Sequence, residues 1–123
     1  MDPDEVTGAQ FRAYRVEAGY VRCDHPDGAE VNGHDAHEAL QAIASVADGS
    51  STPVLVDLRE AHSVSREARQ TFAKSSVPSR IAIYVESSLS RVIANFFISV
   101  SAPNVPTRLF TDLDDAERWL LDD

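Results

Sequence analysis

The sequence predicts an α/β domain with a mostly parallel central sheet, and three observations lead to that class. Nearly uninterrupted apolar runs occupy residues 53–58 and 81–85, as in strands that are buried on both faces. Segments with apolar residues at helical spacing alternate with these runs. Loops rich in Gly, Pro and Asp separate the elements. Such alternation favours parallel strands that are joined by crossover helices.

The first half of the chain is expected to open with an antiparallel hairpin. Residues 10–16 and 20–23 carry Phe, Tyr and Val, and the short segment between them ends in Gly19. Residues 1–9 are expected to be a loosely ordered N-terminal segment, and residues 23–33 a loop. A helix is predicted from about Asp35 to Ala47, with Gly49 as a left-handed residue at its end.

The second half repeats a strand and a helix three times. After the strand at residues 53–57, Ser65 is predicted to cap a helix that ends near Ser76. The later elements are expected to be a strand at residues 80–85, a helix capped by Ser87 or Ser88 that runs to about Ser101, a strand at residues 107–110, and a helix from Thr111 or Asp112 to Leu121. The order is β-β-α-β-α-β-α-β-α, with five strands, the hairpin at an antiparallel edge, and four helices.

Length and charge limit what the protein can be. A chain of 123 residues and 13.4 kDa predicts a single domain over residues 1–123. Its net charge of −9 argues against general nucleic-acid binding, although residues 57–111 carry seven basic and four acidic side chains. The single cysteine, Cys23, fits a reducing compartment, and the acidic start is unlike a signal peptide. We therefore expect a cytoplasmic protein without a membrane span, a disulfide or a cofactor.

Several motifs of the second half resemble those of small bacterial STAS-like proteins, relatives of the anti-sigma-factor antagonists. The fold of that superfamily, called SpoIIAA-like, is shared with Sec14-type lipid-binding domains. The resemblance covers residues 50–123 well and the earlier part only by element order. It is carried by the segments PVLVDLR (53–59), SREAR (65–69), LSRVIANFF (89–97), PTRLFTD (106–112) and AERWL (116–120). It implies a STAS-like fold and a regulatory module that binds a protein partner.

The resemblance also points to one position where this chain departs from the family. Regulatory STAS domains carry Asp-Ser-Ser or Asp-Ser-Gly at the start of the helix after this strand, and a kinase-like partner phosphorylates a serine there. The alignment places Ser65 at the family's Asp, Arg66 at the first Ser, and Glu67 at the serine that is normally modified. A glutamate cannot be phosphorylated, so we expect the switch to be absent or held in an anionic form. Ser63 and Ser65 are nearby hydroxyls that could substitute, although a serine in the place of Ser65 is most often only a helix cap.

The candidate binding site lies at the carboxyl end of the first parallel strand, where ligands of open α/β sheets usually bind. Arginines and free amides at helix starts favour a phosphate or carboxylate group. The candidate residues for a ligand or protein partner are Asp57, Arg59, Ser63, Ser65, Glu67, Ser87, Ser88, Arg91 and Asn95. The alternative is that Asp57 only forms a structural ion pair and Arg91 is a solvated side chain.

The helix predicted after Ser88 is apolar around most of its circumference. Such a helix is either buried on both sides or meets a partner. We predict self-association, as a homo-oligomer that is expected to be a dimer, through Phe96, Phe97 and Ile98. Contact with a hydrophobic ligand, or burial within one subunit, is the alternative.

Three further interpretations are weaker. Cys23, His25, His34 and His37 are weak candidates for a metal site, but their spacing matches no closed zinc motif, and no metal is predicted. His62 with Ser65 and Asp57 could in principle form the catalytic triad of a small hydrolase, although a loop histidine is the simpler interpretation. A Sec14-like carrier of a lipid or other apolar ligand would need a large cavity. The leading hypothesis is a non-enzymatic STAS-like module that binds a protein partner or a small anion.

Overall fold

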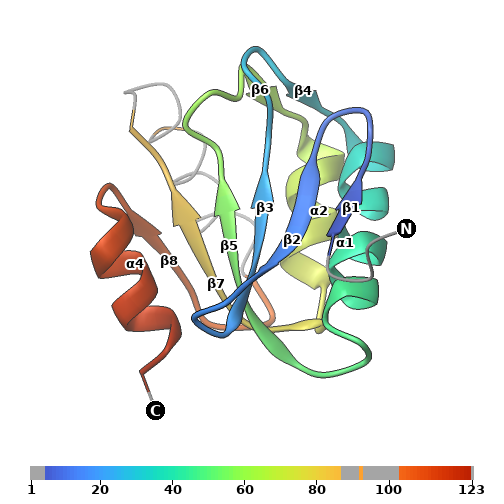
Figure 1. Ribbon diagram of the computed structural model, residues 1–123. Coiled ribbons are helices and arrows are strands. Elements are labelled where there is room, and N and C mark those ends of the chain that lie inside the picture. The colour runs from blue at the N-terminus through green and yellow to red at the C-terminus, as the bar shows by residue number, and fades with distance from the viewer. Residues whose placement is uncertain (1–4, 87–91, 93–102, 123) are drawn as a thin grey trace.

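The computed structural model describes residues 5–86, 92 and 103–122. Within them, a main sheet of six strands has the order β1-β2-β3-β5-β7-β8, and a smaller sheet pairs β4 with β6 (Figure 1). The strands span Glu5–Thr7 (β1), Arg12–Val16 (β2), Tyr20–Asp24 (β3), Glu30–Val31 (β4), Thr52–Asp57 (β5), Ser63–Val64 (β6), Pro78–Tyr84 (β7) and Thr107–Phe110 (β8). The helices are Gly33–Val46 (α1), Arg66–Lys74 (α2) and Leu113–Leu120 (α4). The predicted α/β class is confirmed.

The antiparallel part of the sheet is larger than the sequence indicated. β2 and β3 form the predicted hairpin, and Gly19 in its turn has a φ of +117°, which glycine adopts most readily. β1 lies within residues 1–9, which were expected to be loosely ordered, and pairs antiparallel with β2. Its three residues are too few to show a periodic pattern. The N-terminal edge is therefore a three-stranded meander, and the sheet has one strand more than predicted.

The parallel strands β3, β5, β7 and β8 carry apolar side chains on both faces. Val54 and Val56 of β5 pack toward α1 and α2, whereas Leu55 packs on the opposite face with α4. This division follows from the alternation of side chains along a strand. Helices on both faces explain why the sequence of β5 is an almost continuous apolar run. Figure 1 shows α1 and α2 on one side of the sheet and α4 on the other.

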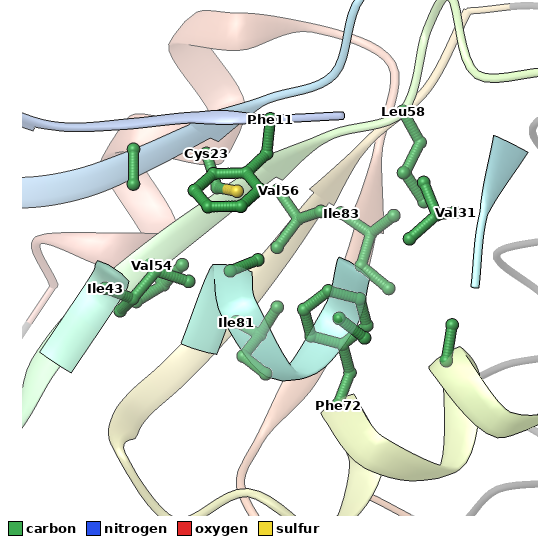
Figure 2. Close-up of a cluster of buried hydrophobic side chains, with 14 of the residues drawn as sticks. Phe11, Cys23, Val31, Ile43, Val54, Val56, Leu58, Phe72, Ile81 and Ile83 are labelled. Carbon is green, nitrogen blue, oxygen red and sulfur yellow. The ribbon is translucent and has the colours of Figure 1, made fainter. Parts of the chain in front are cut away.

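The larger core lies between the sheet and the helices α1 and α2. Phe72 of α2 and Ile43 of α1 are buried against strand residues that include Val56 and Ile83 (Figure 2). Cys23 of β3 is fully buried in the same core. Burial raises the pKa of its thiol to about 12, with a smaller contribution from nearby carboxylates. Cys23 is therefore a packing residue of low reactivity.

The helix starts largely agree with the capping signals in the sequence. Ser65 caps α2 as predicted, because its Oγ accepts a hydrogen bond from the Ala68 amide at 3.0 Å. Asp112 caps α4, as one of the two predicted alternatives. α1 begins earlier than predicted, because Asn32 caps it and forms a reciprocal capping box with Asp35. Apart from Val92, which is exposed, the helix predicted over residues 87–101 lies outside the described residues.

A short parallel pairing joins two segments that the sequence presented as loops. β4 lies within residues 23–33 and pairs with β6, with Glu30 opposite Ser63 and Val31 opposite Val64. Two-residue strands carry no detectable periodicity, so this pairing could not be predicted. Its effect is to hold the chain just before α1 against the chain just before α2 (Figure 1).

Candidate functional site

The carboxylate of Asp57 ends β5 and is held by two arginines. Asp57 is only 7 % exposed. Oδ2 accepts hydrogen bonds from Nη2 of Arg59 at 2.8 Å and from Nη2 of Arg22 at 3.0 Å. Oδ1 accepts from the Arg59 backbone amide at 3.0 Å. The carboxylate is thus buried, doubly ion-paired and fixed in orientation.

The pairing extends across four strands of the sheet. Arg22 also donates from Nε to Asp24 at 2.7 Å, and the hydroxyl of Tyr14 donates to the other oxygen of Asp24 at 2.8 Å. The guanidinium carbon of Arg59 lies 4.4 Å from the ring centroid of Tyr84 on β7. We call this set the Asp57 network: Tyr14, Arg22, Asp24, Asp57, Arg59 and Tyr84.

The electrostatics of the network favour a structural role for Asp57. Burial alone would raise the pKa of the Asp57 carboxyl, but the hydrogen bonds from Arg59 and the charges of Arg59 and Arg22 outweigh it and lower the pKa. The hydrogen bond to Asp57 raises the pKa of Arg59. Burial, aided by the hydrogen bond to Asp24, raises the pKa of Tyr14 to about 12. Two carboxylates offset two guanidinium groups, so Asp57 is a poor general base.

The start of α2 presents an exposed polar surface. We call Ser65, Arg66 and Glu67 the α2 start; Arg66 and Glu67 are exposed, whereas Ser65 is half-buried and uses its hydroxyl as the cap. A Cβ atom added to Gly33 would lie 3.0 Å from the Cβ of Glu67, so the first turns of α1 and α2 are in close contact. Ser63 lies in β6 and is half-buried. Glu67 therefore stands at an accessible edge where two helices begin.

The proposed triad of His62, Ser65 and Asp57 is not assembled in the described part of the chain. Asp57 lies two residues after Leu55 and so shares its face of the sheet, the α4 side, whereas Ser65 begins α2 on the opposite side. His62 is exposed, and its backbone amide donates to Ala29. No hydrogen bond among the described residues joins the His62 ring to Ser65 or Asp57. The arrangement offers no proton transfer between these three groups.

His25, which the sequence suggested only as a weak metal candidate, is buried. Its Nδ1 lies 3.1 Å from the backbone oxygen of Asp57, and because a carbonyl only accepts, Nδ1 carries the proton. Its Nε2 is buried without a hydrogen-bond partner among the described protein atoms. Burial lowers the pKa of His25 despite the opposing effect of the bond to Asp57 and of nearby carboxylates. Nothing in the sequence indicated this burial, because residues 23–33 were expected to form a loop.

The weak metal candidates do not come together. Cys23 is buried in the core, His34 is exposed and pairs with Glu38 at 2.6 Å, and His37 lies exposed on α1. Among the residues that the structure describes, no three His, Cys, Asp or Glu side chains are grouped so that they could hold a metal ion.

The cavity volumes test the alternative that the protein carries a lipid or another apolar ligand. An apolar cavity beneath α2, lined by residues that include Phe72 and Ile83, has a volume of about 20 Å³. A pocket for a drug-sized ligand usually measures roughly 300–1,000 Å³. The larger spaces around the described residues are open grooves, such as one of about 450 Å³ between α1 and α2 near Leu40 and Lys74. None of the helices in the described ranges is long and apolar enough to cross a bilayer.

The remaining candidates lie outside the described residues: Ser87, Ser88, Arg91, Asn95, Phe96, Phe97 and Ile98. Of the candidates that are described, Asp57 and Arg59 come together as an ion pair. Ser63 lies in β6, and Ser65 and Glu67 lie at the α2 start that follows it.

The order of strands and helices defines the class of protein. A crystal structure of an uncharacterized protein of the DUF3478 family from Shewanella loihica PV-4, with a SpoIIAA-like fold, superposes with a TM-score of 0.60 at 18% identity. The match covers 94% of this chain and 98% of that one. The chain therefore has a SpoIIAA-like fold.

The particular family follows from the sequence match. The chain belongs to the family described as Domain of unknown function (DUF7793), which matches residues 14–122. A protein with unknown function from Arthrobacter sp. FB24, of known crystal structure, is 34% identical. That match covers 90% of this chain and 99% of that one, with a TM-score of 0.37. No curated protein matches the chain significantly.

Proposed function

We propose that this protein is a non-catalytic STAS-like module that binds a regulatory protein partner through the α2 start. The observation that carries the proposal is the position of Glu67, which is exposed beside the first turn of α1. By the resemblance stated above, Glu67 occupies the place of the serine that regulatory STAS domains have modified. A partner that docks at this edge meets a permanent negative charge at the positive end of a helix.

The Asp57 network supports binding and disfavours chemistry. Every charged group in it already has an oppositely charged partner, with Arg22 bridging Asp24 and Asp57. A small anion at Arg59 would compete with the buried carboxylate of Asp57. That carboxylate already accepts hydrogen bonds from the backbone amide, Nε and Nη2 of Arg59. A protein partner is therefore the better-supported ligand.

Site-specific crosslinking tests the contact surface directly. A photoreactive phenylalanine analogue is placed at Glu67 and, as a control, at Ser45, an exposed position in the last turn of α1. After irradiation in native cells, a single discrete adduct is expected from position 67 and none of the same mass from position 45. The adduct should disappear when Arg66→Glu is added. The same adducts from both positions, or none from position 67, would contradict the proposal.

We also propose a dimer through the helix predicted over residues 87–101, with Phe96, Phe97 and Ile98 at its interface. The support is the apolar circumference of that segment in the sequence. Light scattering at high micromolar concentration should give twice the monomer mass of 13.4 kDa. Phe97→Glu should give the monomer mass. A monomeric wild type would contradict the dimer and leave the partner-binding proposal standing.

A further inference from the structure

Two neighbouring segments of the chain carry the described part of the candidate site, and His25 is the first residue of one of them. We call residues 25–31 and 57–65 the loop pair. Backbone hydrogen bonds join the two segments along their length, from Gly28 N to Glu60 O at 2.8 Å, from His62 N to Ala29 O at 2.8 Å, and from Ser65 N to Val31 O at 2.8 Å. The last of these reaches the cap of α2. Figure 1 shows the two segments together at the end of the sheet where β4 and β6 lie.

The first link between the two segments is the histidine ring itself. His25 is 7 % exposed, and Nδ1–H donates to the carbonyl of Asp57, where the second segment begins. Nε2 of the ring faces no hydrogen-bond donor or acceptor among the described protein atoms. A neutral ring fits this place, because its bare Nε2 needs no acceptor. A protonated ring would bring a second N–H and a positive charge into the same space without a partner for either.

The charged groups around His25 come from the elements that pack near it. Asp24 precedes it on β3, Asp57 lies on β5, and Asp35 lies in the first turn of α1. Each of these carboxylates is already engaged: Asp24 and Asp57 in the Asp57 network, and Asp35 in the capping box with the Asn32 amide. His25 also lines an open surface pocket together with Arg12 of β2, which pairs with Glu5. None of these groups donates to or accepts from Nε2.

We infer that His25 is a proton-operated latch: protonation of its Nε2 opens the loop pair and loosens the α2 start. The opening lets the new N–H reach water, and it breaks the backbone bonds that hold Gly28, His62 and Ser65. Acid therefore favours the open form. This conformational claim stands alone, and its consequence for partner binding rests on the proposed function.

Amide hydrogen exchange followed by NMR tests the latch. Between pH 7.5 and 5.5, after correction for intrinsic exchange, the opening constant reported by the amides of Gly28, His62 and Ser65 should rise by up to about tenfold. That size follows because a ring exposed by opening has the ordinary histidine pKa of roughly 6.5. The amide of Ala47, at the end of α1, is bonded to Ile43 O and should not follow this change.

Two substitutions show whether the pH dependence of amide protection comes from His25 or from another histidine. His25→Asn keeps a side-chain N–H that can donate to the Asp57 carbonyl but cannot be protonated, so the loop-pair amides should lose their pH dependence. His62→Asn removes an exposed histidine from the same loop pair and should keep that dependence. Wild-type protection that does not change with pH, or a dependence that persists in His25→Asn, overturns the inference.

Two more measurements distinguish failure of the latch from failure of the proposed function. If His25→Asn does not fold, the nitrogen shifts of the His25 ring in the wild type decide: protonation of Nε2 without a change in amide protection overturns the latch. Crosslinking from position 67, repeated in cell lysate at a set pH, should weaken at pH 5.5 in the wild type and not in His25→Asn. The absence of any adduct at either pH counts against the proposed function, while the exchange data still decide the latch.

Discussion

Arg22 on β3 and Asp57 on β5 are joined by an ion pair of 3.0 Å, and both side chains are largely buried. The pair crosses between neighbouring parallel strands at the end of the sheet that carries the loop pair. The same oxygen of Asp57 also pairs with Arg59 at 2.8 Å. This relationship explains why a strand that ends in a carboxylate, in a position typical of active sites, carries a structural charge instead of a reactive one.

Removal of the Asp57 carboxylate should destabilise the fold. Asp57→Ala leaves Arg22 largely buried without its partner, and we expect a loss of about 2–4 kcal/mol in the free energy of unfolding. Arg118→Ala, which breaks an exposed pair with Asp115, should cost less than about 0.5 kcal/mol. Urea unfolding of both variants measures the difference. Equal losses in the two would mean that the Asp57 network contributes no more than a surface ion pair.

The lowered pKa of Asp57 predicts an acid-dependent contribution to stability. The folded pKa lies below the ordinary value of 3.8, so the contribution is present above that pH and disappears as the pH falls through the folded value. Urea unfolding at a series of pH values should show that the wild type and Asp57→Asn converge in strong acid. Asp27→Asn, which removes an exposed carboxylate, is the control for the loss of one negative charge. A gap between wild type and Asp57→Asn that is the same at every pH would contradict this reasoning.

Ser65 is expected to act as a helix cap. Ser65→Ala removes the acceptor of the Ala68 amide and should cost about 1 kcal/mol of stability, whereas Ser65→Asp should restore most of it. Thermal unfolding of the three proteins provides the measurement. Ser63→Ala, in the adjacent half-buried position, is the control and should change little. If phosphate is found on Ser63 or Ser65 in protein from native cells, the expectation that the phosphorylation switch is absent is wrong.

Phe72 anchors α2 in the larger core. Phe72→Ala should lower the free energy of unfolding by about 3–5 kcal/mol, because it enlarges the small cavity that Phe72 lines. Gln70→Ala, on the exposed side of the same helix, should leave stability within about 0.5 kcal/mol. Denaturant titration of both variants tests the burial of this helix face. A mild effect of Phe72→Ala would mean that α2 is less firmly packed than the structure has it.

The elements that could be predicted are those with enough residues to show a pattern. The apolar runs of β5 and β7, and the caps Ser65 and Asp112, were readable because each depends on local sequence. β1, β4 and β6 were missed, since strands of two or three residues owe their existence to a partner that is distant in sequence.

The candidate site was predictable only in part, for the same reason. Asp57 and Arg59 are two residues apart, so their pairing was visible as an alternative. The contributions of Tyr14 and Arg22 depend on the register that sets Tyr14 opposite Arg22, and Asp24 opposite Asp57. His25 looked like a loop histidine, because its burial depends on the pairing of two distant loops.

The measurement that tests the central claim most directly is the affinity of the purified chain for the partner identified by crosslinking at position 67. Isothermal titration calorimetry would compare Glu67→Lys with Glu17→Lys, which makes the same change of charge at an exposed position in the β2–β3 turn. We expect Glu67→Lys to weaken binding by tenfold or more, with Glu17→Lys close to wild type. Equal affinities for the two variants would contradict the assignment of the α2 start as the binding surface.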